Sequence, residues 1–212
     1  AKEMMARTIE KVAPRVKEHD QKVAAYNEFV FGAKNITDIL EVVPDAMTGG
    51  ASLAGRAKEV VSNIQGSINI FLRDPALVAN DPSILTNLVK QTDELKTSLT
   101  TGKWSEVEKN GIANRIIEAN KIQMAYAMAR TATGGSGRDI SNQDFQKFYD
   151  VINAGGDKVV WQRNTQDFLS RAEQTLDLSA KSINEGNENE LFKTLHGYNL
   201  PIKMADDTLT LK

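Results

Sequence analysis

The stretch IQMAYAMA, residues Ile122–Ala129, decides the fold, because its apolar side chains lie all round the helical wheel. A helix that is apolar on every side has to be enclosed by other elements, so it is typical of the centre of a helical bundle. Amphipathic sequence that begins at Trp104 leads into this stretch as one helix. The rest of the chain is expected to supply the helices that surround it.

Two amphipathic segments are predicted at the start of the chain. Between residues 9 and 30, apolar side chains recur at alternating steps of three and four, which places them on one face of a helix. Pro14 is expected to be a first-turn residue or a kink, because proline lacks the backbone N–H that a helix interior uses. A second, short helix is expected over Asn35–Val43, with Thr37 as its N-cap and Pro44 after its end.

Aspartate–proline pairs separate the next two helices. An apolar stripe from Leu53 to Leu72 ends at Asp74–Pro75. Asp81 then provides an N-cap, and Pro82 takes the first position of another amphipathic helix, which Gly102 is expected to close.

Two helices and a tail are predicted after the central helix. One runs from about Ser141 to Asn153, and a longer one follows Gly155–Gly156 and ends near Gly186. No run alternates with a period of two for long enough to propose a sheet, and only the tail from Tyr198 to Leu211 permits an extended conformation.

The expected fold class is therefore all-α, a bundle of about seven to nine amphipathic helices with a short tail that can be extended. We expect an N-terminal helical region over residues 1–101 and a second helical region, with a glycine-rich corner, over residues 102–197. The C-terminal tail covers residues 198–212.

Composition excludes several classes of protein. The 212 residues are 41% hydrophobic, which is enough to bury a sizeable core. A net charge of -2 provides no global basic field for nucleic acid, and the lack of cysteine excludes disulfides and thiolate metal sites. No stretch approaches the roughly 20 apolar residues of a membrane span. Because the chain begins at Ala1 and enters helix-like sequence at once, we expect a piece of a longer polypeptide.

The glycine-rich stretch GGSGRDISNQDFQKF, residues Gly134–Phe148, invites comparison with ion-binding and phosphate-binding loops. A calcium loop needs oxygen ligands at positions one, three and five and an acid at position twelve. With Asp144 at position twelve, the early positions fall on Thr133, Gly135 and Gly137, so the carboxylates are lacking. A phosphate loop needs Lys-Ser or Lys-Thr after the glycines, and neither follows here. No metal or phosphate site is predicted.

We interpret the stretch instead as a corner between two helices. The glycines suit the left-handed conformation that ends a helix, and Ser141 can cap the next one. Asp144 approaches the capping-box pattern, while Ile140 and Phe145 fit a hydrophobic staple across the cap. Arg138 is expected to be solvated or available to a partner. The structural corner is assigned to Gly134, Gly135, Gly137, Arg138, Ile140, Ser141, Asp144 and Phe145.

Other candidate sites favour structural roles. His19 lies on an apolar stripe and His196 beside a glycine, and neither has a second histidine at the spacing of metal ligands. Trp104 and Trp161 are expected to anchor the core. No convergent acid, base and nucleophile can be named, so we expect no catalytic residues, no cofactor and no small-molecule ligand.

One segment resembles a known family. The stretch ANKIQMAYAMARTATGGSGRDISNQDFQKFYDVINAGG, residues Ala119–Gly156, is similar to a helix–corner–helix segment of very large structural proteins of tailed bacteriophages, including internal virion (ejection) proteins and tape-measure-like proteins. The residues that carry the resemblance are Ala125, Tyr126, Ala129, Arg130, Gly137, Arg138, Ser141, Asp144 and Gly155.

The resemblance implies a structural module of a long virion polypeptide, made in the host cytoplasm and carried in the capsid interior or tail. It implies self-association and contacts with portal, core or tail components, and it supplies no catalytic residues. Two phage roles stay open, an internal core protein and a tape-measure segment. Outside phage, the alternatives are a helical adaptor that binds another helix and an enzyme whose fold brings distant acids together.

Overall fold

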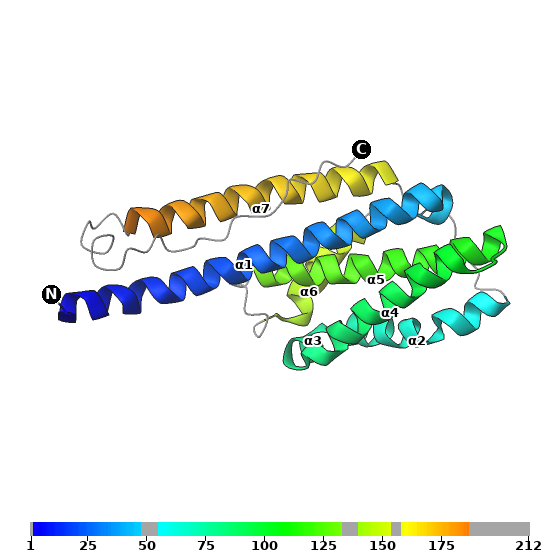
Figure 1. Cartoon of the computed structure of the whole chain (residues 1–212), viewed down its shortest axis with the longest axis horizontal. Helices are drawn as coiled ribbons and strands as arrows, with labels where there is room; N and C mark the ends of the chain where they lie inside the picture. The colour runs from blue at the N-terminus through cyan, green and yellow to red at the C-terminus, as the bar shows by residue number, and fades with distance from the viewer. Residues whose placement is uncertain (1, 48–54, 133–139, 154–157, 187–212) are drawn as a thin grey trace.

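The computed structural model describes residues 2–47, 55–132, 140–153 and 158–186, which form seven α-helices and one 3-10 helix, without a strand in those ranges (Figure 1). The predicted all-α fold class is confirmed. The elements are α1 (Lys2–Val42), η1 (Pro44–Met47), α2 (Arg56–Arg73), α3 (Pro75–Asn80), α4 (Pro82–Thr101), α5 (Glu106–Ala132), α6 (Asn142–Asn153) and α7 (Lys158–Gly186). The predicted tail 198–212 lies outside the described residues.

Helix α5 forms the centre of the bundle, as its all-round apolar sequence predicts. Every residue from Ala119 to Ala129 is buried. The helix packs against α1, α2, α4 and α6 (Figure 1). One hydrophobic cluster joins α5 to helices from both sides of Gly102. Burial of apolar surface around α5 is therefore the main source of stability for the described part of the chain.

Helix α1 is a single element, and this corrects two sequence predictions. The expected break before Asn35 is absent, and Thr37 is no N-cap, because its hydroxyl donates a hydrogen bond of 3.0 Å to the carbonyl of Ala33 inside the helix. Pro14 lies well inside α1 and not in its first turn. The buried face continues past the expected break through Ile36 and Leu40, so tertiary packing holds the helix together there.

Close packing of α1 on α5 needs a glycine at position 32. A Cβ atom built there would lie 2.7 Å from Cγ of Met124, which is far inside van der Waals contact. Because Gly32 has no side chain, α1 and α5 can approach each other closely at this point.

Both aspartate–proline pairs begin helices, which the sequence predicted for Asp81–Pro82 alone. The carboxylate of Asp81 accepts a hydrogen bond from the backbone N–H of Ser83, with Pro82 in the first helical position. Asp74 caps Leu77 in the same way and begins the short helix α3, which the sequence prediction lacks. Both caps satisfy N–H groups that have no partner within the helix.

The end of α4 is also fixed by a side chain. Gly102 follows its last residue, as predicted, and the indole N–H of Trp104 donates a hydrogen bond of 2.7 Å to the carbonyl of Ser98. A Cβ atom on Gly102 would lie 2.1 Å from that indole nitrogen. Trp104 thus packs on the core and covers the end of α4.

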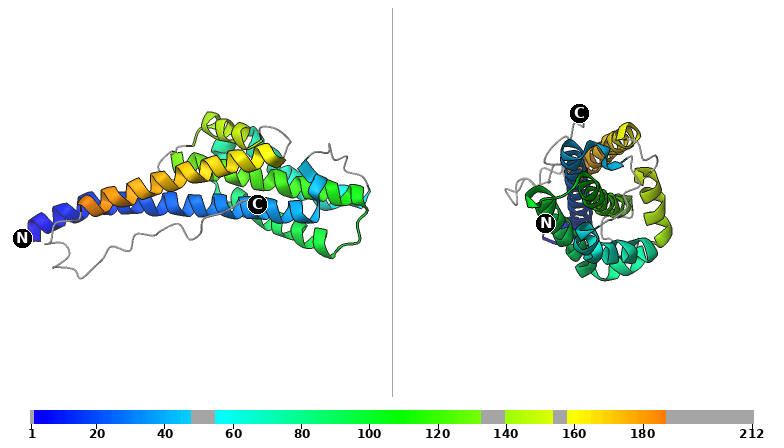
Figure 2. Two further views of the ribbon diagram at one scale, coloured as in Figure 1. Left: turned by 90° about the horizontal axis from the view of Figure 1, so that it is seen from above. Right: turned by 90° about the vertical axis from the view of Figure 1, so that its right-hand side faces the viewer.

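Helix α7 runs antiparallel to α1. His19 Nδ1 lies 3.1 Å from Oγ of Ser179, and the hydroxyl of Tyr26 donates a hydrogen bond of 2.6 Å to Glu173. The two helices extend beyond the other five and make the molecule elongated (Figure 2). None of the described helices is both long and apolar enough to cross a bilayer.

Candidate functional site

The predicted corner is partly described. Gly134, Gly135, Gly137 and Arg138 lie outside the described residues, as does Gly155 from the resembling segment. The other four residues of the corner are described: Ile140 and Ser141 directly precede α6, and Asp144 and Phe145 lie in its first turns. His196 also lies outside the described residues.

The capping box expected at the start of α6 is present. Oγ of Ser141 accepts a hydrogen bond of 3.1 Å from the backbone N–H of Asp144 and donates one of 2.7 Å to its carboxylate. The backbone N–H of Ser141 donates to the same carboxylate oxygen over 3.3 Å. These hydrogen bonds from Ser141 lower the pKa of the Asp144 carboxyl. Ile140 and Phe145 are both buried, as a hydrophobic staple requires.

Replacing Ser141 by Ala should lower the free energy of unfolding by about 1 kcal/mol, the usual loss for an N-cap. Because the cap lowers the pKa of Asp144, its contribution is present above the unfolded pKa of about 4 and is lost as pH falls through the folded pKa. Urea denaturation at pH 7 and pH 3 measures both effects. Ser170→Ala, on the exposed face of α7, is the matched control, and an equal loss in both variants would contradict the cap.

Calcium is expected to leave the thermal midpoint of the chain unchanged, since a ligand stabilises only the state that binds it. A rise of several degrees in millimolar calcium, removed by Asp144→Asn, would instead make the corner a cation site. Within the described ranges, no group of three histidine, aspartate or glutamate side chains is placed to hold a metal ion.

The two tryptophans and His19 contribute to packing between helices. Trp161 is completely buried in the core cluster, and Trp104 packs against that cluster. His19 is 2% exposed between α1 and α7, and its ring nitrogen meets the hydroxyl of Ser179. A serine and a histidine at this distance suggest a nucleophile and its base, but a substrate would not reach an imidazole buried between two helices. We assign the pair to interhelical packing.

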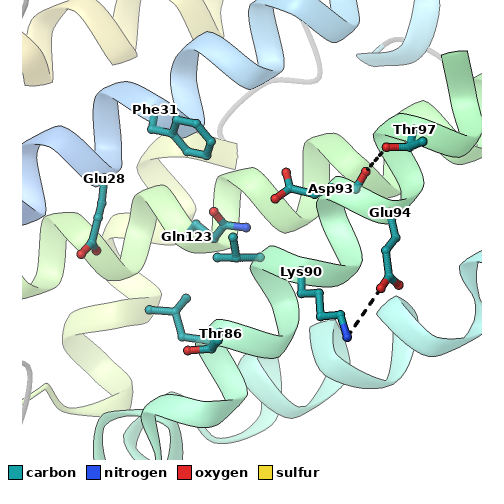
Figure 3. Close-up of a pocket in the computed structure, with 10 residues that line it drawn as sticks. Glu28, Phe31, Thr86, Lys90, Asp93, Glu94, Thr97 and Gln123 are labelled. Carbon is teal, nitrogen blue, oxygen red and sulfur yellow. Dashed lines mark hydrogen bonds and ion pairs between the residues drawn. The ribbon is translucent and has the colours of Figure 1, made fainter.

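An open groove lies between α1 and α4 and was not anticipated from sequence. Its volume is about 740 Å³, and α5 forms part of its floor (Figure 3). Its apolar lining includes Leu85 and Val89 of α4 and Phe31 of α1. The Phe31 side chain is 50% exposed, although the residues on either side of it, Val30 and Gly32, are buried. Such an exposed aromatic surface is a common feature of binding sites for proteins.

The rim of the groove is acidic. Glu28, Asp93 and Glu94 line it, together with one base, Lys90. Lys90 lies 3.8 Å from Glu94, and both side chains are mostly exposed, so this pair is weak. Glu28 accepts hydrogen bonds of 2.7 and 2.8 Å from Arg130. The Asp93 carboxylate has no ion pair within the described part of the chain.

Gln123 of α5 lies at the floor of the groove (Figure 3). Its side chain is 8% exposed, and its amide nitrogen has no hydrogen-bond partner among the described residues. A buried donor without a partner costs about 1–3 kcal/mol, and this nitrogen is itself shielded from the groove. The groove therefore combines an apolar wall and an acidic rim.

One sequence signal could have pointed to the groove. The predicted stripe of α1 passes through Val23, Tyr26 and Val30, and Phe31 falls outside it. An aromatic residue off the buried stripe is exposed unless another element covers it. The helices that meet around Phe31 could not be known from the sequence.

No protein family, curated protein or solved structure matches the chain.

Proposed function

We propose that the chain is a non-enzymatic structural module of a large bacteriophage virion protein, an internal core or ejection protein that acts in assembly and genome delivery. The observation that carries the proposal is the position of the resembling segment in the fold. Ala125, Tyr126 and Ala129 lie in the buried part of α5, and Ser141 and Asp144 form the cap of α6. The resemblance therefore involves the residues that build the centre of the bundle.

Arg130, a charged residue of the resembling segment, also has a structural partner. Arg130 joins the end of α5 to α1, because its Nη1 donates hydrogen bonds of 2.8 and 2.7 Å to the two carboxylate oxygens of Glu28. A rigid helical unit of this kind suits a protein that works through contacts with neighbours. We propose these neighbours to be further copies and portal, core or tail components, within the virion.

Mass spectrometry of virions tests this proposal. Particles are purified by density gradient from a culture of the organism that encodes the chain, and peptides from it are quantified against the major capsid protein. We expect these peptides to sediment with intact particles. Peptides found only in the soluble lysate, and never with particles, would overturn the virion assignment.

Dissociated particles distinguish the two phage roles. A core or ejection protein should fractionate with capsids and be lost on genome release, whereas a tape-measure segment should fractionate with tails.

The groove favours a second candidate, a helical adaptor unrelated to phage. Its open apolar wall matches the way in which one helix is bound by a groove between two others. Size-exclusion chromatography separates the candidates, because an assembly module should associate with itself or with virion components. A monomer that forms a complex with a non-virion protein would favour the adaptor.

A further inference from the structure

We propose that residues 198–204 of the same chain lie in the groove between α1 and α4 and cover its apolar wall. These residues lie outside the ranges that the structure describes. Three observations carry the assignment: the open apolar wall, the alternating sequence of the segment, and the length of chain that joins it to α7. The contact does not depend on the virion assignment.

The wall of the groove is an apolar surface that the described residues leave open. Phe31, Leu85 and Val89 line it, and the Phe31 side chain is 50% exposed. Phe29, two residues earlier, lies on the opposite side of α1, where its ring centroid is 4.4 Å from that of Phe168 in α7. Phe31 therefore faces away from α7, and none of the described helices covers it fully. Removal of this surface from water would stabilise the chain.

The segment has the sequence YNLPIKM, in which apolar residues occupy every second position. Successive side chains of an extended chain point to opposite sides, so such alternation is typical of an extended segment with one face buried. The buried face would consist of Tyr198, Leu200, Ile202 and Met204.

A surface formed by helices suits this face better than a sheet does. Pro201 has no backbone N–H, which disfavours a place in the interior of a sheet. The described ranges also contain no strand with which the segment could pair. The apolar wall of the groove can bury the same side chains without a sheet.

The segment matches the groove in length and in charge. The lining of α4 runs from Leu85 to Thr97, about 18 Å at the helical rise of 1.5 Å per residue, and the extended segment spans about 20 Å. Its one charged residue, Lys203, belongs to the face opposite the apolar one. Lys203 would then lie at the rim, where Asp93 has no ion pair within the described part of the chain.

The chain between α7 and the segment is long enough to reach the groove. His19 contacts Ser179, so Gly186, seven residues further along α7, lies near the level of α1 seven residues before His19. Phe31 is then about 28 Å away along α1 and about 10 Å across it. Tyr198 follows Gly186 by 12 residues, and an extended chain of that length spans up to about 40 Å.

The lack of native cysteine allows a direct test by disulfide formation in the full chain. Val89→Cys with Leu200→Cys puts one thiol on the wall and the other on the apolar face of the segment. In air with copper phenanthroline, an intramolecular disulfide should form about tenfold faster than in Val89→Cys with Asn199→Cys, whose second thiol is on the opposite face. Mass spectrometry and non-reducing gels measure the rates.

The position of the first thiol provides a further control. Leu178 is 67% exposed on α7, so Leu178→Cys with Leu200→Cys should form the disulfide as slowly as the Asn199 pair. Equal rates for all three pairs would overturn the proposal. A disulfide that joins two chains would also overturn it, because the occupant would then come from a second copy.

Trypsin cleavage after Lys203 tests the contact from both of its sides. Phe31→Asp in the groove and Leu200→Asp in the segment should each speed cleavage about tenfold, because cleavage follows the population of the open form. Both changes break the same contact, so the double variant should be cleaved no faster than either single one. Val159→Ala, an exposed change on α7, should leave the rate unchanged.

Circular dichroism checks that Phe31→Asp remains folded, and the disulfide test does not need this variant. Cleavage that is equally fast in the folded Phe31→Asp variant and in the wild type would show that the segment lies outside the groove.

Discussion

Replacing Trp161 by Ala should lower the free energy of unfolding by about 3–5 kcal/mol, the range for loss of a large buried side chain. Trp161 is completely buried and heads the largest side chains of the core. It lies near the start of α7, which packs on α1 and α6. Its removal would lose apolar burial and leave a cavity that rigid neighbouring helices fill only in part. Urea denaturation followed by far-ultraviolet circular dichroism measures the loss.

Two controls separate this cavity from a general effect on α7. Trp161→Phe keeps an aromatic ring and removes an indole N–H that has no partner within the described residues, so it should recover more than half of the loss. Val159→Ala, two residues earlier and 69% exposed, should change stability by less than about 0.5 kcal/mol. A loss below about 1 kcal/mol for Trp161→Ala would mean that α7 is not packed as described.

The parts of the fold that sequence predicted are those with local causes. Asp81 and Pro82 lie side by side in the chain and begin α4 wherever it packs. Ser141 and Asp144 are three residues apart, so their capping box needs only one helical turn. The central place of α5 followed from its own composition, because a helix that is apolar all round has to be enclosed.

The errors concern residues whose partners are distant in sequence. One such error is the helix predicted to begin at Asn35, with Thr37 as its N-cap. In the structure Asn35 is buried inside α1. Its amide nitrogen donates a hydrogen bond to Asn120, and its carbonyl oxygen accepts one from Lys96. These partners lie 85 and 61 residues away, and no local pattern announces them.

The groove escaped prediction for the same reason. Leu85 lies in the predicted amphipathic helix that begins at Pro82, and it is only half-buried because it lines the open groove. Gln123 lies within a stretch read as apolar all round. Its place in the lining of the groove follows only from the positions of α1 and α4 around α5. Sequence thus predicted the all-α class and the caps at Asp81 and Ser141, whereas the surface between the helices depends on how they pack.

The buried polar contact between α1 and α5 yields the last prediction, that Asn120→Asp should destabilise the chain by about 3–5 kcal/mol at pH 7, the cost of an uncompensated buried charge. Asn120 is completely buried, and its amide nitrogen donates a hydrogen bond of 2.8 Å to the carbonyl of Ile116. A carboxylate keeps the acceptor that Asn35 uses, over 3.2 Å, but faces the Ile116 carbonyl with a second acceptor. Both burial and this repulsion disfavour the ionised form.

The loss should depend on pH in a defined direction. Burial raises the pKa of the introduced carboxyl above its unfolded value of about 4, so the folded state holds a proton that the unfolded state has released. Stability relative to wild type should therefore fall as pH rises from 4 and level off above the folded pKa. Asn120→Leu removes the acceptor of the Asn35 amide, which the Asp variant keeps, and adds no charge, so its loss should stay constant over this range. Urea denaturation between pH 4 and 8 distinguishes the two. A small loss of stability that does not change with pH would contradict this prediction. It would mean that Lys96, which already donates a hydrogen bond to Asn35, moves to pair with the new carboxylate.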